Sequence, residues 1–139
     1  MQPRSFARGW SFASAMLALA LGAAVLAAPV AASAEGHVLA SGEFRGKSGH
    51  AASGGVSVVK TATGVVVVLA PDFKFDGAPD PKLGFGKNGY VKSTQFSILK
   101  SNSGEQTYDI PAAIDPANYT EVWVWCEKYS VPLGVATLK

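Results

Sequence analysis

The sequence is poor in the side chains that usually carry redox or metal chemistry. It contains one cysteine, Cys126, together with two histidines and two methionines. A single cysteine cannot form a disulfide within the chain, and it has no second thiol for an internal dithiol cycle. Covalent c-type haem is excluded, because the Cys-x-x-Cys-His attachment motif is absent. Any cofactor or redox hypothesis must therefore rest on Cys126 and on very few other residues.

The sequence also lacks an apolar run long enough to span a membrane. The longest apolar run, Ala15 to Ala28, has about 14 residues, whereas a spanning helix needs ~20. It follows a basic start and precedes Ala32-Ser33-Ala34, a small-x-small pattern that signal peptidase accepts. We therefore predict a cleavable signal peptide over residues 1–34 and a mature chain over 35–139. The mature chain is expected to be exported, periplasmic or secreted, with no membrane span after signal removal.

The mature chain has no excess of either charge. The whole sequence has 12 basic and 10 acidic residues, and two of the basic ones, Arg4 and Arg8, lie in the predicted leader. Ten basic and ten acidic residues remain, so the net charge of the mature chain is zero. Nucleic-acid binding needs a basic cluster, and none is present. We expect no nucleic-acid partner.

The mature chain carries the pattern of an all-β domain. Runs of β-branched and aromatic residues alternate with Gly, Pro, Asn, Asp and Ser, and no convincing helical stripe of apolar residues occurs. Thr61 to Gly64 and Ser101 to Gly104 are expected to form tight turns. We predict one domain, an antiparallel β-sandwich or partly closed barrel of about 7–9 short strands. The expected strands are Val38–Phe44, Val56–Lys60, Val65–Leu69, Phe96–Leu99, Thr107–Ile110, Val122–Tyr129 and Leu133–Leu138.

Cys126 lies in one of these strands, where alternate residues point to opposite faces. Val122, Val124 and Cys126 then share the face that is the natural core, with Cys126 near the end of the strand. Trp123 and Trp125 share the second face, either covered by a loop or exposed as an aromatic patch. Exported cysteines normally pair, so an unpaired Cys126 is either a buried hydrophobe or a site of redox or ligand chemistry.

Two metal sites can be weighed from the residues alone. His37, His50 and Cys126 match in number the ligands of a blue-copper centre. No histidine follows Cys126 in the way that such centres usually require, and His37 lies close to the predicted new terminus, so copper is disfavoured. Three aspartates recur at every fourth position from 72 to 80, but they do not match an EF-hand loop. They are interpreted as turn formers that bond to local backbone amides.

Several short motifs, in this order and spacing, resemble the DM13 domain family. The resemblance covers Gly42 to Leu138. The motifs that carry it are Gly42-Glu-Phe44, His50, Val67-Val-Leu69, Phe73-Lys-Phe75, Gly77-Ala-Pro-Asp-Pro81 with Leu83-Gly84, Gly104-Glu-Gln-Thr-Tyr108 with Ile110-Pro111, Tyr119, Val122-Trp-Val-Trp-Cys126 and Val131-Pro-Leu-Gly-Val-Ala-Thr-Leu138.

The resemblance implies a redox or electron-transfer module at the cell surface, and it does not indicate a stand-alone enzyme. Cys126 matches the family's characteristic cysteine, for which a role as a naked thiol or as a ligand of a prosthetic group such as haem has been suggested. His50 matches the family's histidine and is a candidate second ligand. Because the chain lacks methionine after its leader, a His/Met-ligated haem is excluded, and a Cys126 thiolate with or without His50 stays allowed. The electron partner would be a separate redox or cell-envelope protein.

A second interpretation comes from a different functional class. The domain could be a non-enzymatic binding module that presents its loops or the Trp123/Trp125 face to a cell-envelope partner. In that case Cys126 would be a buried core residue and nothing more. The accessibility and reactivity of the thiol distinguish the two interpretations.

Overall fold

The computed structural model describes residues 36–139, so the predicted signal peptide lies outside the described residues. The described chain is all β, as predicted, with ten strands and two short 3-10 helices. In chain order these are β1 (His37–Gly46), β2 (Ala52–Ser53), β3 (Gly55–Lys60), β4 (Val65–Leu69), β5 (Lys74–Phe75), β6 (Pro81–Gly86), η1 (Lys92–Thr94), β7 (Ser97–Ile98), β8 (Gln106–Asp109), η2 (Pro116–Asn118), β9 (Glu121–Cys126) and β10 (Val131–Thr137). No helix within residues 36–139 is long and apolar enough to cross a membrane.

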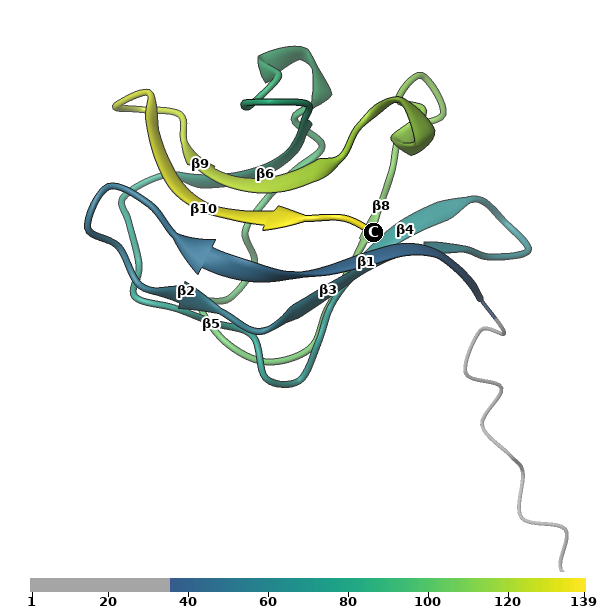
Figure 1. The fold of residues 1–139 in the computed structure, drawn as a ribbon, viewed down its shortest axis with the longest axis horizontal. Helices are drawn as coiled ribbons and strands as arrows, with labels where there is room; N and C mark the ends of the chain where they lie inside the picture. The colour runs from purple at the N-terminus through teal and green to yellow at the C-terminus, as the bar shows by residue number, and fades with distance from the viewer. Residues whose placement is uncertain (1–35) are drawn as a thin grey trace, which may run out of the picture. The chain divides into compact units, whose positions relative to one another are not determined.

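Eight of the strands form one antiparallel sheet that curls around the core (Figure 1). Their order is β7-β6-β9-β10-β1-β3-β4-β8, and β2 pairs with β5 in a separate two-stranded sheet. Tight turns join neighbouring strands, as at Thr61, whose backbone N–H donates to the carbonyl of Gly64 between β3 and β4. Gly104 has a φ of 86° between β7 and β8, so the two turns predicted from the sequence are confirmed.

The two edge strands of the sheet, β7 and β8, meet through side chains. The hydroxyl of Tyr108 on β8 accepts a hydrogen bond from the backbone N–H of Lys100, just after β7, at 2.9 Å. The Lys100 ammonium donates to the carbonyl of Thr107 at 2.8 Å, and the rings of Phe96 and Tyr108 pack edge to face. No strand pair joins these edges in the described chain. The sheet is therefore a nearly closed barrel, in agreement with the predicted fold class.

The barrel interior is a continuous hydrophobic core. Alternate residues of each strand point inward, so Val122 and Val124 of β9 are fully buried, as are Leu83 and Phe85 of β6. The remaining buried apolar residues of this cluster are Phe44, Ala52, Val56, Val58, Val67, Leu69, Phe73, Phe75, Leu99, Tyr108, Ile110, Cys126, Leu133 and Ala136.

The sequence pattern predicted seven of the ten described strands and missed β6 and the two-residue strands β2 and β5. The run Val65–Leu69 is predicted to the residue, and the other six lie within a few residues of their predicted ends. The pattern missed β6, because Pro81 and two glycines interrupt its apolar alternation. The two-residue strands β2 and β5 are too short to leave a periodic signal.

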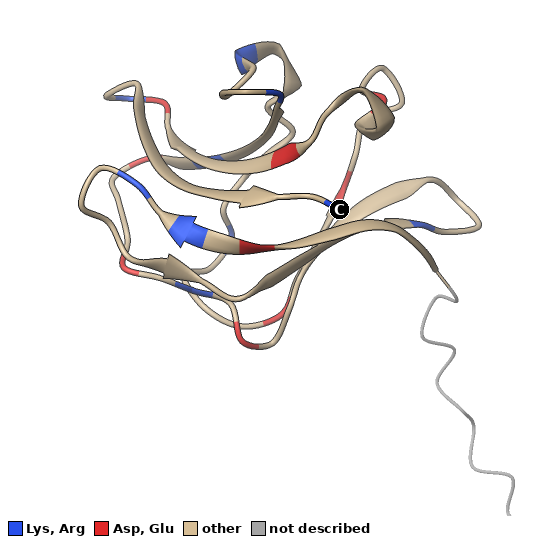
Figure 2. Ribbon diagram, in the orientation of Figure 1, with Lys and Arg blue, Asp and Glu red and all other residues tan. Residues whose placement is uncertain are grey.

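Charged residues of both signs are distributed over the barrel. Figure 2 shows basic and acidic segments interspersed along the strands and turns. Among the described side chains, Lys82 forms ion pairs with both Asp80 and Glu127, and the His50 ring contacts the carboxylate of Asp76. This mixed distribution fits the balanced charge of the predicted mature chain.

Candidate functional site

Cys126 is the last residue of β9 and points into the core. It lies opposite Pro81 of β6 and Val131 of β10 in the two ladders that flank β9. Its side chain is 2% exposed. The predicted orientation, inward with Val122 and Val124 and near the end of the strand, is confirmed. The thiol is therefore one residue from a surface turn and yet shielded from solvent.

The two tryptophans of β9 lie on the outer face and are covered by the segment between β6 and β7. Trp123 is 9% exposed, and its indole N–H donates to the Glu121 carboxylate at 2.9 Å. Trp125 stacks on Tyr90, with ring centroids 4.5 Å apart and planes 12° from parallel. Burial, followed by the nearby charge of Glu127, raises the pKa of Tyr90 to about 12. Of the two predicted alternatives for this face, the loop-covered one is correct.

His50 lies in the segment that follows β1, where it is held by a carboxylate. Its Nδ1 is 2.9 Å from Oδ1 of Asp76, and the other oxygen, Oδ2, accepts the backbone N–H of Ala51 at 3.0 Å. The hydrogen bond from Ala51 and then that from His50 lower the pKa of Asp76 below its ordinary value of 3.8. An ionised carboxylate only accepts hydrogen bonds, so Nδ1 carries a proton, and in the neutral ring the free lone pair is on Nε2. This is the arrangement that orients histidine as a base or ligand.

Strand register places Cys126 and His50 at the same end of the barrel. Val131 of β10 lies opposite Cys126, and Gly134 of the same strand lies opposite Gly46, where β1 ends. His50 follows four residues later. β9 and β1 are separated only by β10, which is about 10 Å across the sheet at the usual strand spacing. The structure thus brings the two predicted site residues to one end of the molecule, on different elements.

His37 lies at the other end of the barrel. It begins β1, and the ten residues of that strand span roughly 30 Å before the turn that leads to His50. The three residues weighed for copper therefore do not come together. Within residues 36–139, no three His, Cys, Asp or Glu side chains form a group that could hold a metal ion.

The surroundings of Cys126 do not fit a haem. A macrocycle needs a large cavity into which its axial ligand projects. Cys126 is instead 2% exposed and belongs to the packed core, in which Val124 and Leu133 are also buried. Within this packing the sulfur lacks the space that an axial ligand of haem requires.

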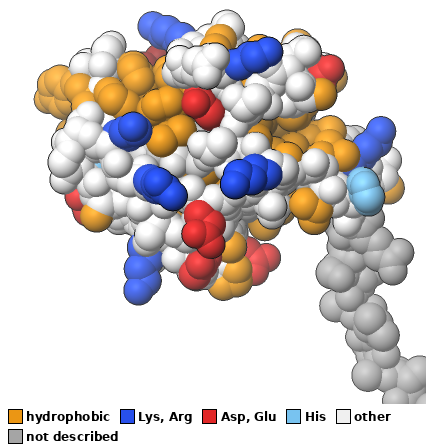
Figure 3. Space-filling view, in the orientation of Figure 1, with side chains coloured by type: hydrophobic (Ala, Val, Ile, Leu, Met, Phe, Trp, Pro, Cys, Tyr) orange, Lys and Arg blue, Asp and Glu red, His pale blue; other side chains and the backbone are white. Residues whose placement is uncertain are grey.

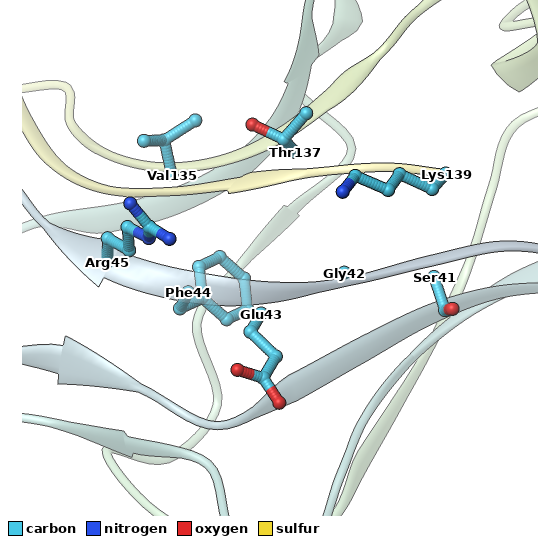
Figure 4. Close-up of a pocket in the computed structure, with 8 residues that line it drawn as sticks. All are labelled: Ser41, Gly42, Glu43, Phe44, Arg45, Val135, Thr137 and Lys139. Carbon is cyan, nitrogen blue, oxygen red and sulfur yellow. The ribbon is translucent and has the colours of Figure 1, made fainter.

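Two surface pockets lie near the strands that carry these residues. One, of about 400 Å³, adjoins Asp76 and is lined by Gly46, Ala51, Ala52, Ser53, Lys74, Phe75 and Asp76. The other, of about 500 Å³, lies over β1 and β10 (Figure 4). In this second pocket Arg45 and Lys139 extend along the strands, whereas Glu43 points away from them. Cys126 lines neither pocket.

Sequence reasoning missed the role of Asp76. The aspartates were expected to bond to local amides, but Asp76 bonds to Ala51 and His50, which precede it by 25 and 26 residues. Asp72 likewise accepts the backbone N–H of Gly55, 17 residues earlier. No local signal could have shown this, because Asp76 meets its partners only when the segment after β5 folds against the segment before β2, and Asp72 meets Gly55 only when the segment before β5 folds against the start of β3.

A comparison with protein-family models confirms the family resemblance that the sequence motifs indicated. The family model described as electron transfer DM13 matches residues 43–138. No curated protein and no solved structure matches the chain. The matched region contains β2 to β10, almost all of β1, and both candidate residues, His50 and Cys126. Because the match covers more than half of the sequence, the chain belongs to the DM13 family of electron-transfer domains.

Proposed function

We propose that this exported domain transfers reducing equivalents through Cys126, which acts as a redox thiol toward a separate protein of the cell envelope. The observation that carries the proposal is the position of Cys126, at the end of β9, one residue before an exposed turn and at the same end of the barrel as the His50–Asp76 pair. Membership of an electron-transfer family supports it.

The proposed reaction is thiol–disulfide exchange with a disulfide of the partner. The Cys126 sulfur attacks one sulfur of that disulfide, so a new S–S bond forms as the partner's S–S bond breaks. The thiol proton passes to the leaving sulfur, which departs as a thiol. A separate dithiol protein, the electron donor, then resolves the mixed disulfide, because the chain has no other cysteine. Its first thiol attacks the Cys126 sulfur and releases the partner in its reduced form, and its second thiol then closes the donor's own disulfide as Cys126 departs as a thiol. His50 Nε2 is proposed to receive the Cys126 thiol proton first, through water after the turn opens, because the strands that lead to the two residues lie about 10 Å apart.

Access to the thiol requires the turn between β9 and β10 to open. This turn is closed by a long hydrogen bond of 3.4 Å from Ser130 N–H to the carbonyl of Glu127, and Ser130 has a φ of 52°. The Tyr129 side chain is 59% exposed. Few buried contacts hold such a segment, so it can open without unfolding the barrel. Cys126 is the first core residue that this opening would uncover.

A second candidate function is a binding module in which Cys126 only packs. The observation that favours it is the 2% exposure of Cys126 within the hydrophobic core. Here the exposed loops would contact a cell-envelope partner, and removal of the sulfur would cost ~1 kcal/mol of stability without affecting partner binding. Thiol reactivity in the folded state separates this candidate from the redox thiol.

The test compares two buried thiols on the same face of β9. The first protein is the natural chain, and the second carries Cys126→Ala with Val124→Cys, which moves the thiol two residues into the fully buried part of the strand. Both are mixed with an aromatic disulfide reagent under native conditions, and rates are corrected for measured stability. Cys126 should react at least ~10-fold faster, because local opening reaches only the strand end.

The variant His50→Gln tests the proposed base: it should slow this reaction while leaving global stability within ~1 kcal/mol, since the His50 ring is partly exposed. Equal rates for the thiols at 124 and 126 would mean that only global unfolding uncovers Cys126. That result would contradict the redox proposal and leave the binding module.

A further inference from the structure

A groove of about 530 Å³ lies at the end of the barrel opposite Cys126. It is formed where β1 begins, β3 ends and β4 begins, together with the segment around η2 and the chain after β10. Figure 3 shows hydrophobic side chains gathered where β1 begins, at the right of the view. The lining residues are Leu39, Ala40, Val58, Lys60, Val65, Asp115, Pro116, Ala117, Tyr119, Thr120 and Leu138.

The groove reaches into the core of the barrel. Val58, which lines it, is only 1% exposed and belongs to the core cluster. Tyr119 lines it as well and stacks on the fully buried Phe85, with ring centroids 5.7 Å apart. The ladder between β1 and β3 shifts register between Val38 and Ala40, and the intervening Leu39 is 50% exposed at the mouth. Irregularities of this kind are common where a barrel rim forms a binding site.

One cation lies at the mouth of this groove. Lys60 follows Val58 by two residues on β3 and so is on the same side of the strand, and at the strand end its side chain is exposed at the rim of the groove. No carboxylate forms an ion pair with Lys60 among residues 36–139. Asp115 also lines the groove, but its Oδ1 accepts the N–H of Ala117 at 3.0 Å as the cap of η2. An ammonium on the apolar wall of a pocket offers a ligand one charged anchor.

We propose that this groove binds a small amphiphile with an apolar body and one carboxylate, such as a medium-chain fatty acid. The apolar body lies between Leu39, Val58 and Tyr119, and the carboxylate pairs with the Lys60 ammonium. The volume falls within the 300–1,000 Å³ typical of small-molecule sites, and apolar lining with few polar groups is the usual composition of such sites. This site is at the far end of the barrel from Cys126, so it does not depend on the redox proposal.

Dodecanoate at submicellar concentration tests the site, with dodecanol as the uncharged probe. Binding to the purified full chain is measured by calorimetry, and amide chemical-shift changes locate it. We expect shifts confined to the groove and tighter binding of dodecanoate than of dodecanol. Shifts over a different surface, or no binding of either probe, would overturn the proposal.

Three charged residues with exposed side chains provide variants that test the Lys60 anchor. Lys60→Gln should weaken dodecanoate ~5-fold, as expected for a partly solvated ion pair, and should leave dodecanol unchanged. Asp115→Asn keeps a residue that can cap η2 and removes a negative charge, so it should tighten dodecanoate binding. Lys47→Gln, an exposed lysine at the opposite end, should change nothing. An equal response of Lys60→Gln and Lys47→Gln would contradict the proposed anchor.

Discussion

At the scale of the residue, Asp76 shows how a single side chain ties distant parts of the chain together. Its two oxygens bind the His50 ring and the Ala51 N–H, and through them the segment after β5 is held to the segment before β2. These hydrogen bonds stabilise the ionised carboxylate, which is why the pKa of Asp76 lies below 3.8. The same bonds fix the tautomer of His50.

The lowered pKa of Asp76 predicts a loss of stability in acid. A carboxyl group whose pKa is lower when folded stabilises the protein above its unfolded pKa, near 3.8, and this contribution is lost as the pH falls through the folded pKa. Asp76→Asn should therefore reduce the dependence of unfolding free energy on pH below about 4. Urea unfolding from pH 2 to pH 6 measures this.

Asp72→Asn is the control for that experiment, because Asp72 also accepts a backbone N–H, from Gly55. It also removes a carboxylate that accepts a backbone N–H, but one that does not contact His50, and both variants should lower the unfolding free energy at pH 6. If Asp76→Asn retains the full acid dependence, then another carboxyl group accounts for it.

The residues that the sequence could identify are those whose role follows from strand periodicity. Alternation placed Cys126 on the core side of β9 and the two tryptophans on the other, and both placements are confirmed. It could not find Asp76, whose partners are 25 or more residues away. Nor could it show that Lys60 lines a groove, because the wall around η2 comes from a different part of the chain.

At the scale of the element, the packing around β6 explains why its sequence does not have the apolar alternation of a strand. Gly84 and Gly86 lie on the outer face of this strand, where Tyr90 and Trp123 cover them. A Cβ at Gly84 would meet the Tyr90 ring at 2.7 Å. Glycine is therefore required by packing between the strand and the aromatic rings, although its low β-propensity conceals the strand from a propensity-based prediction.

Gly86→Ala should disrupt this outer layer. The added methyl group would overlap the Gly89 carbonyl oxygen and the Trp123 indole nitrogen, so the tryptophan must move away from Glu121. We expect a loss of ~1–3 kcal/mol in unfolding free energy, the usual cost of overpacking. Urea unfolding followed by tryptophan fluorescence measures both the stability and the displacement of the ring.

Lys87→Ala, at the exposed neighbouring position, is the matched control and should stay within ~0.5 kcal/mol of the natural chain. If Gly86→Ala is equally mild, the contact between β6 and Trp123 is looser than the structure indicates.

At the scale of the whole molecule, the barrel has two ends with different composition. The end with Cys126 carries the His50–Asp76 pair, and the opposite end carries the apolar groove with Lys60. The all-β class and most strands followed from the sequence, which left a sandwich and a partly closed barrel as alternatives; contacts between the two edges of the sheet decide for the barrel. Tyr108 is central to that closure: its hydroxyl accepts from the Lys100 N–H and donates to the Gln106 side chain.

Tyr108→Phe should therefore weaken the seam between β7 and β8. It leaves the Lys100 N–H without its partner in a partly buried place, which should cost ~1–3 kcal/mol. Amide hydrogen exchange should rise in β7 and β8 and stay unchanged in β3, since β3 is paired on both sides. Tyr129→Phe removes a hydroxyl from a side chain that is 59% exposed and should have no effect. Exchange that rises equally in all strands would mean that the barrel opens as one cooperative unit, because the seam would then be no weaker than the backbone ladders.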